Sequence, residues 1–127
     1  MGAMDDRVWT VDDHLRDADP AHVELWRAFA ALVESTGPVT YAVAKTTITF
    51  KGPRRGFAGA RPTRQGVEGY LDTLRPLDGD PRILRSSPYQ RNLHVNRFRI
   101  RSLADLDETF AGWVREAAAV GSGAHLA

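Results

Sequence analysis

The chain has 127 residues, of which 43% are hydrophobic and none is cysteine, and 17 basic against 16 acidic residues give a formal net charge of +1. This length and composition fit a single domain over residues 1–127 that buries a core of its own. The lack of cysteine excludes disulfides, thiol nucleophiles and thiolate metal sites.

The first residues, MGAMDDRVW, are acidic and lack the basic and then apolar pattern of a signal peptide. Residues 1–3 resemble a cloning remnant. No apolar run approaches the roughly 20 residues that a membrane helix needs. We therefore expect a cytoplasmic protein with no membrane partner.

Two helices are predicted near the start of the chain. Thr10 begins a capping-box pattern that predicts a short helix through about Asp17. Asp19 can cap a second helix, and Pro20 suits its first turn. Apolar residues then recur at three- and four-residue spacing. They are Val23, Trp26, Phe29, Ala30 and Val33. Gly37–Pro38 ends this helix.

From residue 39 to residue 101 the hydrophobic period changes to two, which is typical of strands. In the first predicted strand, Ile48 and Phe50 alternate with polar residues, so one face is buried and the other wet. The predicted strands cover residues 45–51, 57–61, 66–74 and 93–101, with a turn at 52–56 and an acidic loop at 76–81. The stretch 83–89 fits either a strand or a loop.

The last predicted strand, 93–101, has an ambiguous register because its apolar residues change sides. Either both faces are partly covered, or a bulge switches them. If Phe98 and Ile100 face the core, His94 and Asn96 lie on that side as well. Three guanidinium groups then share the opposite face, namely Arg97, Arg99 and Arg101.

An amphipathic helix is predicted to close the chain. A capping box at Ser102–Asp105 opens it, and Gly121 ends it before a loose tail over 121–127. Its apolar stripe contains Leu106, Phe110, Trp113, Val114 and Ala117. Strands joined by short connections and flanked by helices imply an α+β fold. We predict an antiparallel β-meander of about four to five strands with the N-terminal and C-terminal helices packed on one face.

Charge is unevenly distributed along the chain. Residues 1–36 carry a formal charge of −5, residues 37–101 carry +9, and residues 102–127 carry −3. A basic sheet between acidic helices favours a polyanionic partner. The alternative is that the arginines pair with neighbouring acids and keep the sheet edges from associating.

The stretch KGPRRGFAGARP contains RGFA, which matches the first half of an RNA-recognition signature. That signature needs further aromatic residues to stack bases, but Gly59, Ala60 and Pro62 follow Phe57. The required helix between the strands is also absent. We therefore interpret residues 56–60 as a strand of small residues that allow close packing or the approach of a ligand.

Three segments together resemble a bacterial domain-of-unknown-function family, number 5655. They are KTTITFKGPRRGFAGARP, SPYQRNLHVNRFRI and SLADLDETFAGWVREA, and the resemblance covers residues 9–126. It supplies no catalytic residues. Similar domains are implied to occur alone or attached to other bacterial domains, including predicted nuclease-like ones, which implies an accessory or binding role.

Enzyme motifs are weak in this sequence. Tyr41 and Lys45 have the spacing of the short-chain dehydrogenase pair, but the Gly-rich dinucleotide turn is missing. The four histidines are scattered without metal-ligand spacing. We predict no catalytic residue, no metal and no cofactor, and we lean against an enzyme.

The leading hypothesis is a non-catalytic accessory module whose basic sheet binds nucleic acid or another polyanion. The proposed anion-binding residues are Lys45, Lys51, Arg54, Arg55, Arg61, Arg64, Arg97 and Arg99. One alternative is a protein-interaction module that docks through its acidic helices or its sheet face. Another is a small-ligand or enzymatic pocket between sheet and helices, around Tyr70, His94 and Lys45. The leading hypothesis depends on whether the basic residues share one face.

Overall fold

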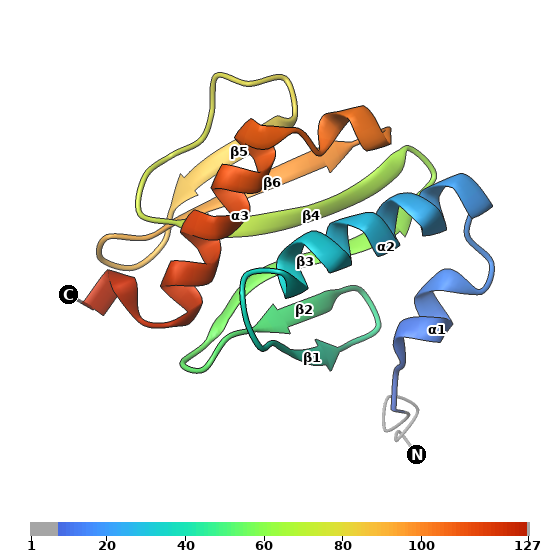
Figure 1. Cartoon of the computed structure of the whole chain (residues 1–127), viewed down its shortest axis with the longest axis horizontal. Coiled ribbons are helices and arrows are strands. Elements are labelled where there is room, and N and C mark those ends of the chain that lie inside the picture. Colours follow the sequence, from blue (N-terminus) through green and yellow to red (C-terminus); the bar gives the residue numbers. More distant parts are fainter. Residues whose placement is uncertain (1–7, 127) are drawn as a thin grey trace, which may run out of the picture.

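A sheet covered by helices on one side organises the chain, as the computed structural model shows for residues 8–126 (Figure 1). Within this range the six strands are β1 (Thr40–Val43), β2 (Ile48–Lys51), β3 (Gly56–Thr63), β4 (Gly66–Thr73), β5 (Ile83–Pro88) and β6 (His94–Ile100). The helices are α1 (Val11–Leu15), α2 (Pro20–Glu34) and α3 (Glu108–Gly121), with short 3-10 helices η2 (Leu103–Asp105) and η3 (Ala124–Leu126). The predicted α+β class is confirmed.

The strands form one antiparallel sheet in the order β1-β2-β3-β4-β6-β5. The sheet resembles the predicted meander, but β6 lies between β4 and β5, so β5 becomes an edge. The strand count is slightly higher than predicted because β1 is a separate four-residue strand that pairs with β2. The stretch that the sequence left undecided forms β5, and its pairing with β6 stabilises it there.

Side-chain caps fix where the helices begin. The Thr10 side chain accepts a hydrogen bond from the Asp13 N–H, and Asp19 caps α2 before Pro20, as predicted. The prediction for the last helix was wrong by about one turn. The capping box at Ser102 opens η2, and the chain then leaves helical geometry at Leu106. Helix α3 begins only after Asp107, whose side chain accepts from the Phe110 N–H at 2.9 Å.

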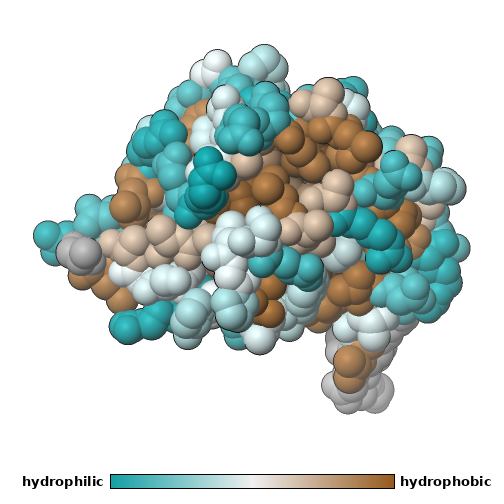
Figure 2. All heavy atoms as spheres, in the orientation of Figure 1, coloured by the Kyte–Doolittle hydropathy of each residue, from teal (hydrophilic) through white to brown (hydrophobic). Residues whose placement is uncertain are grey.

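The core lies between the sheet and the helices α2 and α3. Phe29 of α2, Phe98 of β6 and Phe110 of α3 are fully buried, and Phe98 stands 5.3 Å from each of the other two rings. Trp26 is also buried, and its indole N–H donates to the Ala60 carbonyl of β3 at 2.8 Å. Figure 2 views the molecule from the helix side and shows hydrophobic residues gathered along the seam between α2 and α3.

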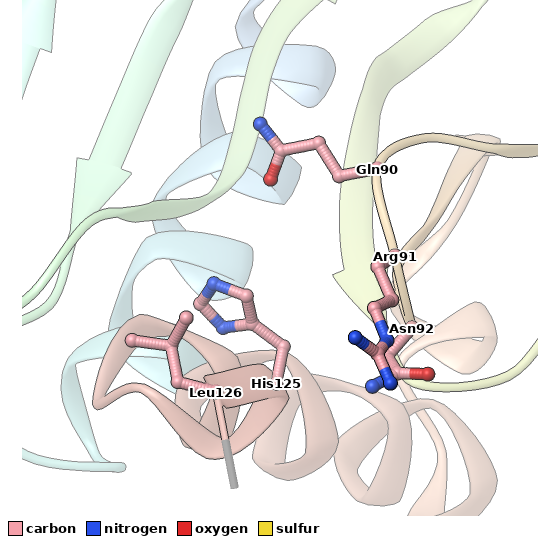
Figure 3. Close-up of a pocket in the computed structure, with 5 residues that line it drawn as sticks. All are labelled: Gln90, Arg91, Asn92, His125 and Leu126. Atoms are coloured by element: carbon pink, nitrogen blue, oxygen red, sulfur yellow. The ribbon is translucent and has the colours of Figure 1, made fainter.

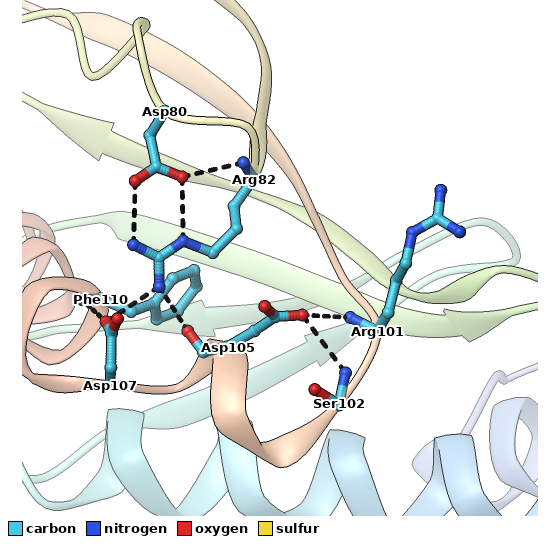
Figure 4. Close-up of polar contacts among 7 residues, drawn as sticks. All are labelled: Asp80, Arg82, Arg101, Ser102, Asp105, Asp107 and Phe110. Atoms are coloured by element: carbon cyan, nitrogen blue, oxygen red, sulfur yellow. Dashed lines mark hydrogen bonds and ion pairs between the residues drawn. The ribbon is translucent and has the colours of Figure 1, made fainter.

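An arginine clamp joins the loop before β5 to the start of α3 (Figure 4). Arg82 donates to both carboxylate oxygens of Asp80 at 2.9 Å, to Asp107 at 2.9 Å and to the Asp105 carbonyl at 2.6 Å. Its guanidinium also lies 4.9 Å from the centre of the Trp113 ring. The Asp80 carboxylate is the main cause of the raised pKa of Arg82, with Asp107 adding to it. Arg82 therefore has a structural role, because its hydrogen bonds join the loop before β5 to the start of α3.

The ends of the described chain lie apart in Figure 1. The expected cloning remnant at residues 1–3 lies outside the described residues. Where we expected a loose tail, the chain after Gly121 forms a turn and then η3. Among residues 8–126, no helix is long and apolar enough to cross a membrane.

Candidate anion-binding face

Alternate residues of each strand point away from α2 and α3 and form what we call the open face, which includes Thr49, Arg61, Tyr70 and Arg97. The register of β6 establishes this arrangement. Phe98 and Ile100 are fully buried beneath the helices, so Arg97 and Arg99, which alternate with them along β6, point to the other side. Of the registers that the sequence allowed, the structure has the one in which Phe98 and Ile100 face the core.

Strand pairing brings basic residues from distant parts of the sequence together. Arg61 of β3 lies opposite Glu68 of β4, and Glu68 lies opposite Arg99 of β6. In the next row, Arg97 of β6 lies between Tyr70 of β4 and Arg85 of β5. The basic side chains of four strands therefore share the open face, because Lys51 of β2 also follows the alternation that places Thr49 there.

Some of these cations are neutralised within the fold. Arg99 donates to Glu68 at 3.1 Å, and Arg55 reaches from the β2–β3 turn to Asp72 at 2.8 Å. Within the described residues, no ion pair involves four other basic side chains of this face. These are Lys51, Arg61, Arg85 and Arg97. Arg85 and Arg97 are paired across the strands, where like charges destabilise a sheet.

Three of the predicted anion-binding residues lie in turns instead of on the strands. Lys45 is in the β1–β2 turn, and Arg64 in the β3–β4 turn borders a hollow that also contains Arg61. Arg54 lies in the β2–β3 turn, where its backbone N–H donates to the Gly121 carbonyl at 2.8 Å. The other five predicted residues reach the open face. They are Lys51, Arg55, Arg61, Arg97 and Arg99.

Asp72 is the most deeply buried charged residue of the open face, with 4% of its surface exposed. Burial raises its pKa to about 6, because the cost of desolvating the carboxylate exceeds the attraction of Arg55. Oδ2 accepts from Arg55, whereas Oδ1 has no hydrogen-bond partner in the described part of the chain. The burial of this carboxyl depends on strand pairing, and the local sequence pattern indicates only that Asp72 lies in a strand.

Tyr70 and His94 do not share a pocket. Tyr70 belongs to the open face, as its pairing with Arg97 shows, and burial raises the pKa of its phenol. His94 pairs with Thr73, two residues after the core residue Leu71, and so lies on the helix side of the sheet. Tyr70 and His94 therefore do not line one small-ligand or enzymatic pocket, contrary to the alternative considered from the sequence.

The RGFA stretch does not present an aromatic ring to a ligand. Phe57 is 1% exposed and packs against the end of α3. A Cβ atom added at Gly121 would lie 2.4 Å from the Phe57 ring, so the contact requires the glycine there. This burial agrees with our rejection of an RNA-recognition strand at this position.

A second hollow of about 520 Å³ lies between the loop before β6 and the C-terminal turn (Figure 3). Gln90, Arg91 and Asn92 line one side, and His125 and Leu126 line the other. The backbones of Gln90 and Asn92 have φ values of 60° and 64°. This hollow offers one arginine, so it is a weaker anion site than the open face. In the residues that the structure describes, no group of three or more acidic or histidine side chains could hold a metal ion.

The fold and this site define an α+β domain whose antiparallel sheet is covered by helices on one face and carries basic residues on the other. The chain belongs to the family described as Domain of unknown function (DUF5655), which matches residues 11–118, more than half of the chain. The resemblance found in the sequence is thereby confirmed. Comparisons with curated proteins and with solved structures gave no match.

Proposed function

We propose that this domain binds the phosphate backbone of a single-stranded nucleic acid across its open face. The observation that carries the proposal is the set of cations on this face without an ion pair in the described chain, above all Arg85, which pairs with Arg97 next to the register shift of β5. Like charges on paired strands repel each other, and a bound polyanion would relieve that repulsion. Each arginine can also donate to phosphate oxygens in a bidentate manner.

The shape of the sheet favours a single strand over a duplex. Strands lie about 4.8 Å apart, so the sheet from β1 to β5 is about 24 Å wide. The major groove of B-DNA is about 12 Å wide and cannot admit such a surface. A flexible single strand can instead follow the cations from β2 to β5. Contacts to phosphates position the strand but read little sequence.

The composition of the open face supports this proposal over the alternative of a protein-interaction module. Among the described strands, its apolar side chains are few: Ala42, Tyr70 and Val95, with Leu84 exposed beside Arg85 where the register of β5 shifts. The centre of a protein interface is usually apolar and depleted of charge. Protein docking through the acidic helices remains the second candidate. The main proposal also includes an accessory role in the bacterial cytoplasm. A domain that binds nucleic acid would meet its ligand in that compartment.

Fluorescence anisotropy with labelled single-stranded DNA, single-stranded RNA and duplex DNA tests the proposal, at about 50 and 200 mM salt. We expect the single strands to bind more tightly than the duplex, and affinity to fall steeply with salt. The double variant Arg61→Gln and Arg97→Gln should lose most of this affinity. Its slope of log affinity against log salt should also become shallower by about 1.4, since each lost phosphate contact removes about 0.7.

A matched control removes the same number of charges from the other side of the molecule. Arg27 of α2 and Arg115 of α3 are exposed, and changing both to Gln also lowers the net charge by two. This variant should bind as the wild type does. Equal losses in the two variants would show that net charge alone governs binding. Absence of binding to all three nucleic acids at low salt would contradict the proposal and favour the protein-interaction module.

A further inference from the structure

Tyr70 is placed across the centre of the open face. Its side chain starts on β4 and crosses β3 at Gly59, and its hydroxyl lies 3.5 Å from the Thr49 Oγ1 atom on β2. A Cβ atom added at Gly59 would stand 2.5 Å from the Tyr70 Cε1 atom. The glycine is therefore what allows the ring to lie over the middle strand.

The ring borders a hollow of about 330 Å³. Arg61 and Arg97 also line it, and threonines from β3 and from the β1–β2 turn complete it. Its volume falls at the lower end of the range for small-ligand sites, roughly 300–1,000 Å³. The hollow thus combines an aromatic ring, hydroxyl groups and two guanidinium groups without an ion pair in the described residues.

Glu68, the acidic residue that lines this hollow, should repel a bound anion only weakly. Glu68 accepts from Arg99 at 3.1 Å and from the Thr63 hydroxyl at 3.1 Å, so its charge is already compensated. Arg61 and Arg97 make no such pair and remain available. The hollow therefore has a surplus of positive charge beside an aromatic ring, which favours a ligand that joins an aromatic group to phosphates.

From this geometry we infer that the hollow holds one base of the bound strand, with the base stacked on Tyr70 and the flanking phosphates held by Arg61 and Arg97. The inference rests on the proposed function and adds a base contact to it. Stacking accepts any base because every base has a π-face, so the site discriminates single strands from duplexes more than one sequence from another.

No other aromatic residue of the described strands is in a position to stack on this face. Phe50, Phe57 and Phe98 are buried in the core. Tyr41 pairs with Phe50 and donates its hydroxyl hydrogen bond to Glu34 of α2, so it belongs to the helix side. Base stacking on the open face would therefore depend on one residue, which makes the inference simple to test.

The test compares an oligothymidine with an abasic oligonucleotide of the same length and phosphate count, by competition anisotropy. We expect the wild type to bind the oligothymidine about fivefold or more tightly than the abasic strand. Tyr70→Leu should bind both strands as the wild type binds the abasic one, with an unchanged salt slope. Tyr70→Phe keeps the ring and should retain the preference.

A second variant keeps the aromatic residue but moves it. Gly59→Ala should displace the Tyr70 ring and abolish the preference for bases, as Tyr70→Leu does. Equal wild-type affinity for the two strands, with steep salt dependence, would overturn the stacking site while leaving phosphate binding intact. A preference that survives Tyr70→Leu would overturn it as well. Failure of the wild type to bind either strand would overturn the proposed function together with the inference.

Discussion

The two faces of the sheet are built from the same strands but have opposite chemistry. In β6, Phe98 is fully buried against the helices, and its neighbour Arg97 is exposed on the other side. In β4, Leu71 belongs to the core, and Tyr70 lies on the open face. Alternate residues of one strand thus stabilise the fold and form the candidate binding surface. Substitutions on the two faces should therefore separate stability from binding.

The largest effect is expected from the helix side. Phe98→Ala removes a ring that contacts Phe29 and Phe110 and leaves a cavity, so the free energy of unfolding should fall by about 3–5 kcal/mol. Urea denaturation followed by circular dichroism measures this change. Tyr89→Ala is the control, because this aromatic residue is half exposed. A loss below about 1 kcal/mol for Phe98→Ala would mean that the core is not packed as described.

Asp72 should make stability depend on pH, although it lies on the open face. Its pKa of about 6 lies above the usual value near 4, so the folded state binds the proton more tightly than the unfolded chain does. The carboxyl therefore lowers stability as pH rises from about 4 to about 6, and the loss is complete above that range.

Asp72→Asn removes this titration. Relative to the wild type, the variant should gain roughly 2 kcal/mol of stability between pH 4 and pH 7. Unfolding in urea at several pH values measures the difference in the free energy of unfolding between the two proteins. The titration of the other groups is common to both and cancels in this difference. A constant difference across this range would contradict a raised pKa at Asp72.

The arginine clamp should matter more than an exposed ion pair. Arg82→Ala removes several charge-assisted hydrogen bonds and the packing on Trp113, so we expect a loss of about 1–2 kcal/mol. Arg75→Ala breaks a well-formed but exposed pair with Glu116 and should cost less than about 1 kcal/mol. Thermal unfolding of the two variants gives the comparison. The reverse order would show that the clamp is not a main tie between the β5 loop and α3.

The smallest effect on stability is expected from Arg97→Gln. This side chain is exposed and faces the like charge of Arg85, so the free energy of unfolding should change by less than about 0.5 kcal/mol, or even rise. Chemical denaturation tests this, and anisotropy on the same sample tests binding. A large loss of stability would show that Arg97 has a structural role.

Local patterns in the sequence predicted the parts of the fold that depend on interactions between residues close together in the chain. The caps at Thr10 and Asp19 and the two-residue period of β2 were visible because each involves neighbours along the chain. The start of α3 was missed by about a turn because the sequence offers two successive caps, first Ser102 with Asp105 and then Asp107.

The site could be predicted less completely, because it depends on pairing between strands. Arg85 was missed since β5 is an edge strand whose pattern fits a loop equally well. Tyr70 and His94 were grouped without knowledge of the β4–β6 register, which puts them on opposite faces. The position of Tyr70 over Gly59 also joins residues of different strands, and no local signal in the sequence reveals it.

The most direct test of the two-face account is a titration of the isotope-labelled protein with a single-stranded oligothymidine, followed by amide NMR spectra. We predict that the largest shift changes fall on open-face residues of β3, β4 and β6, around Arg61, Tyr70 and Arg97, and that α2 and α3 change little. Shift changes concentrated on α2 and α3, with the open face unaffected, would contradict the account.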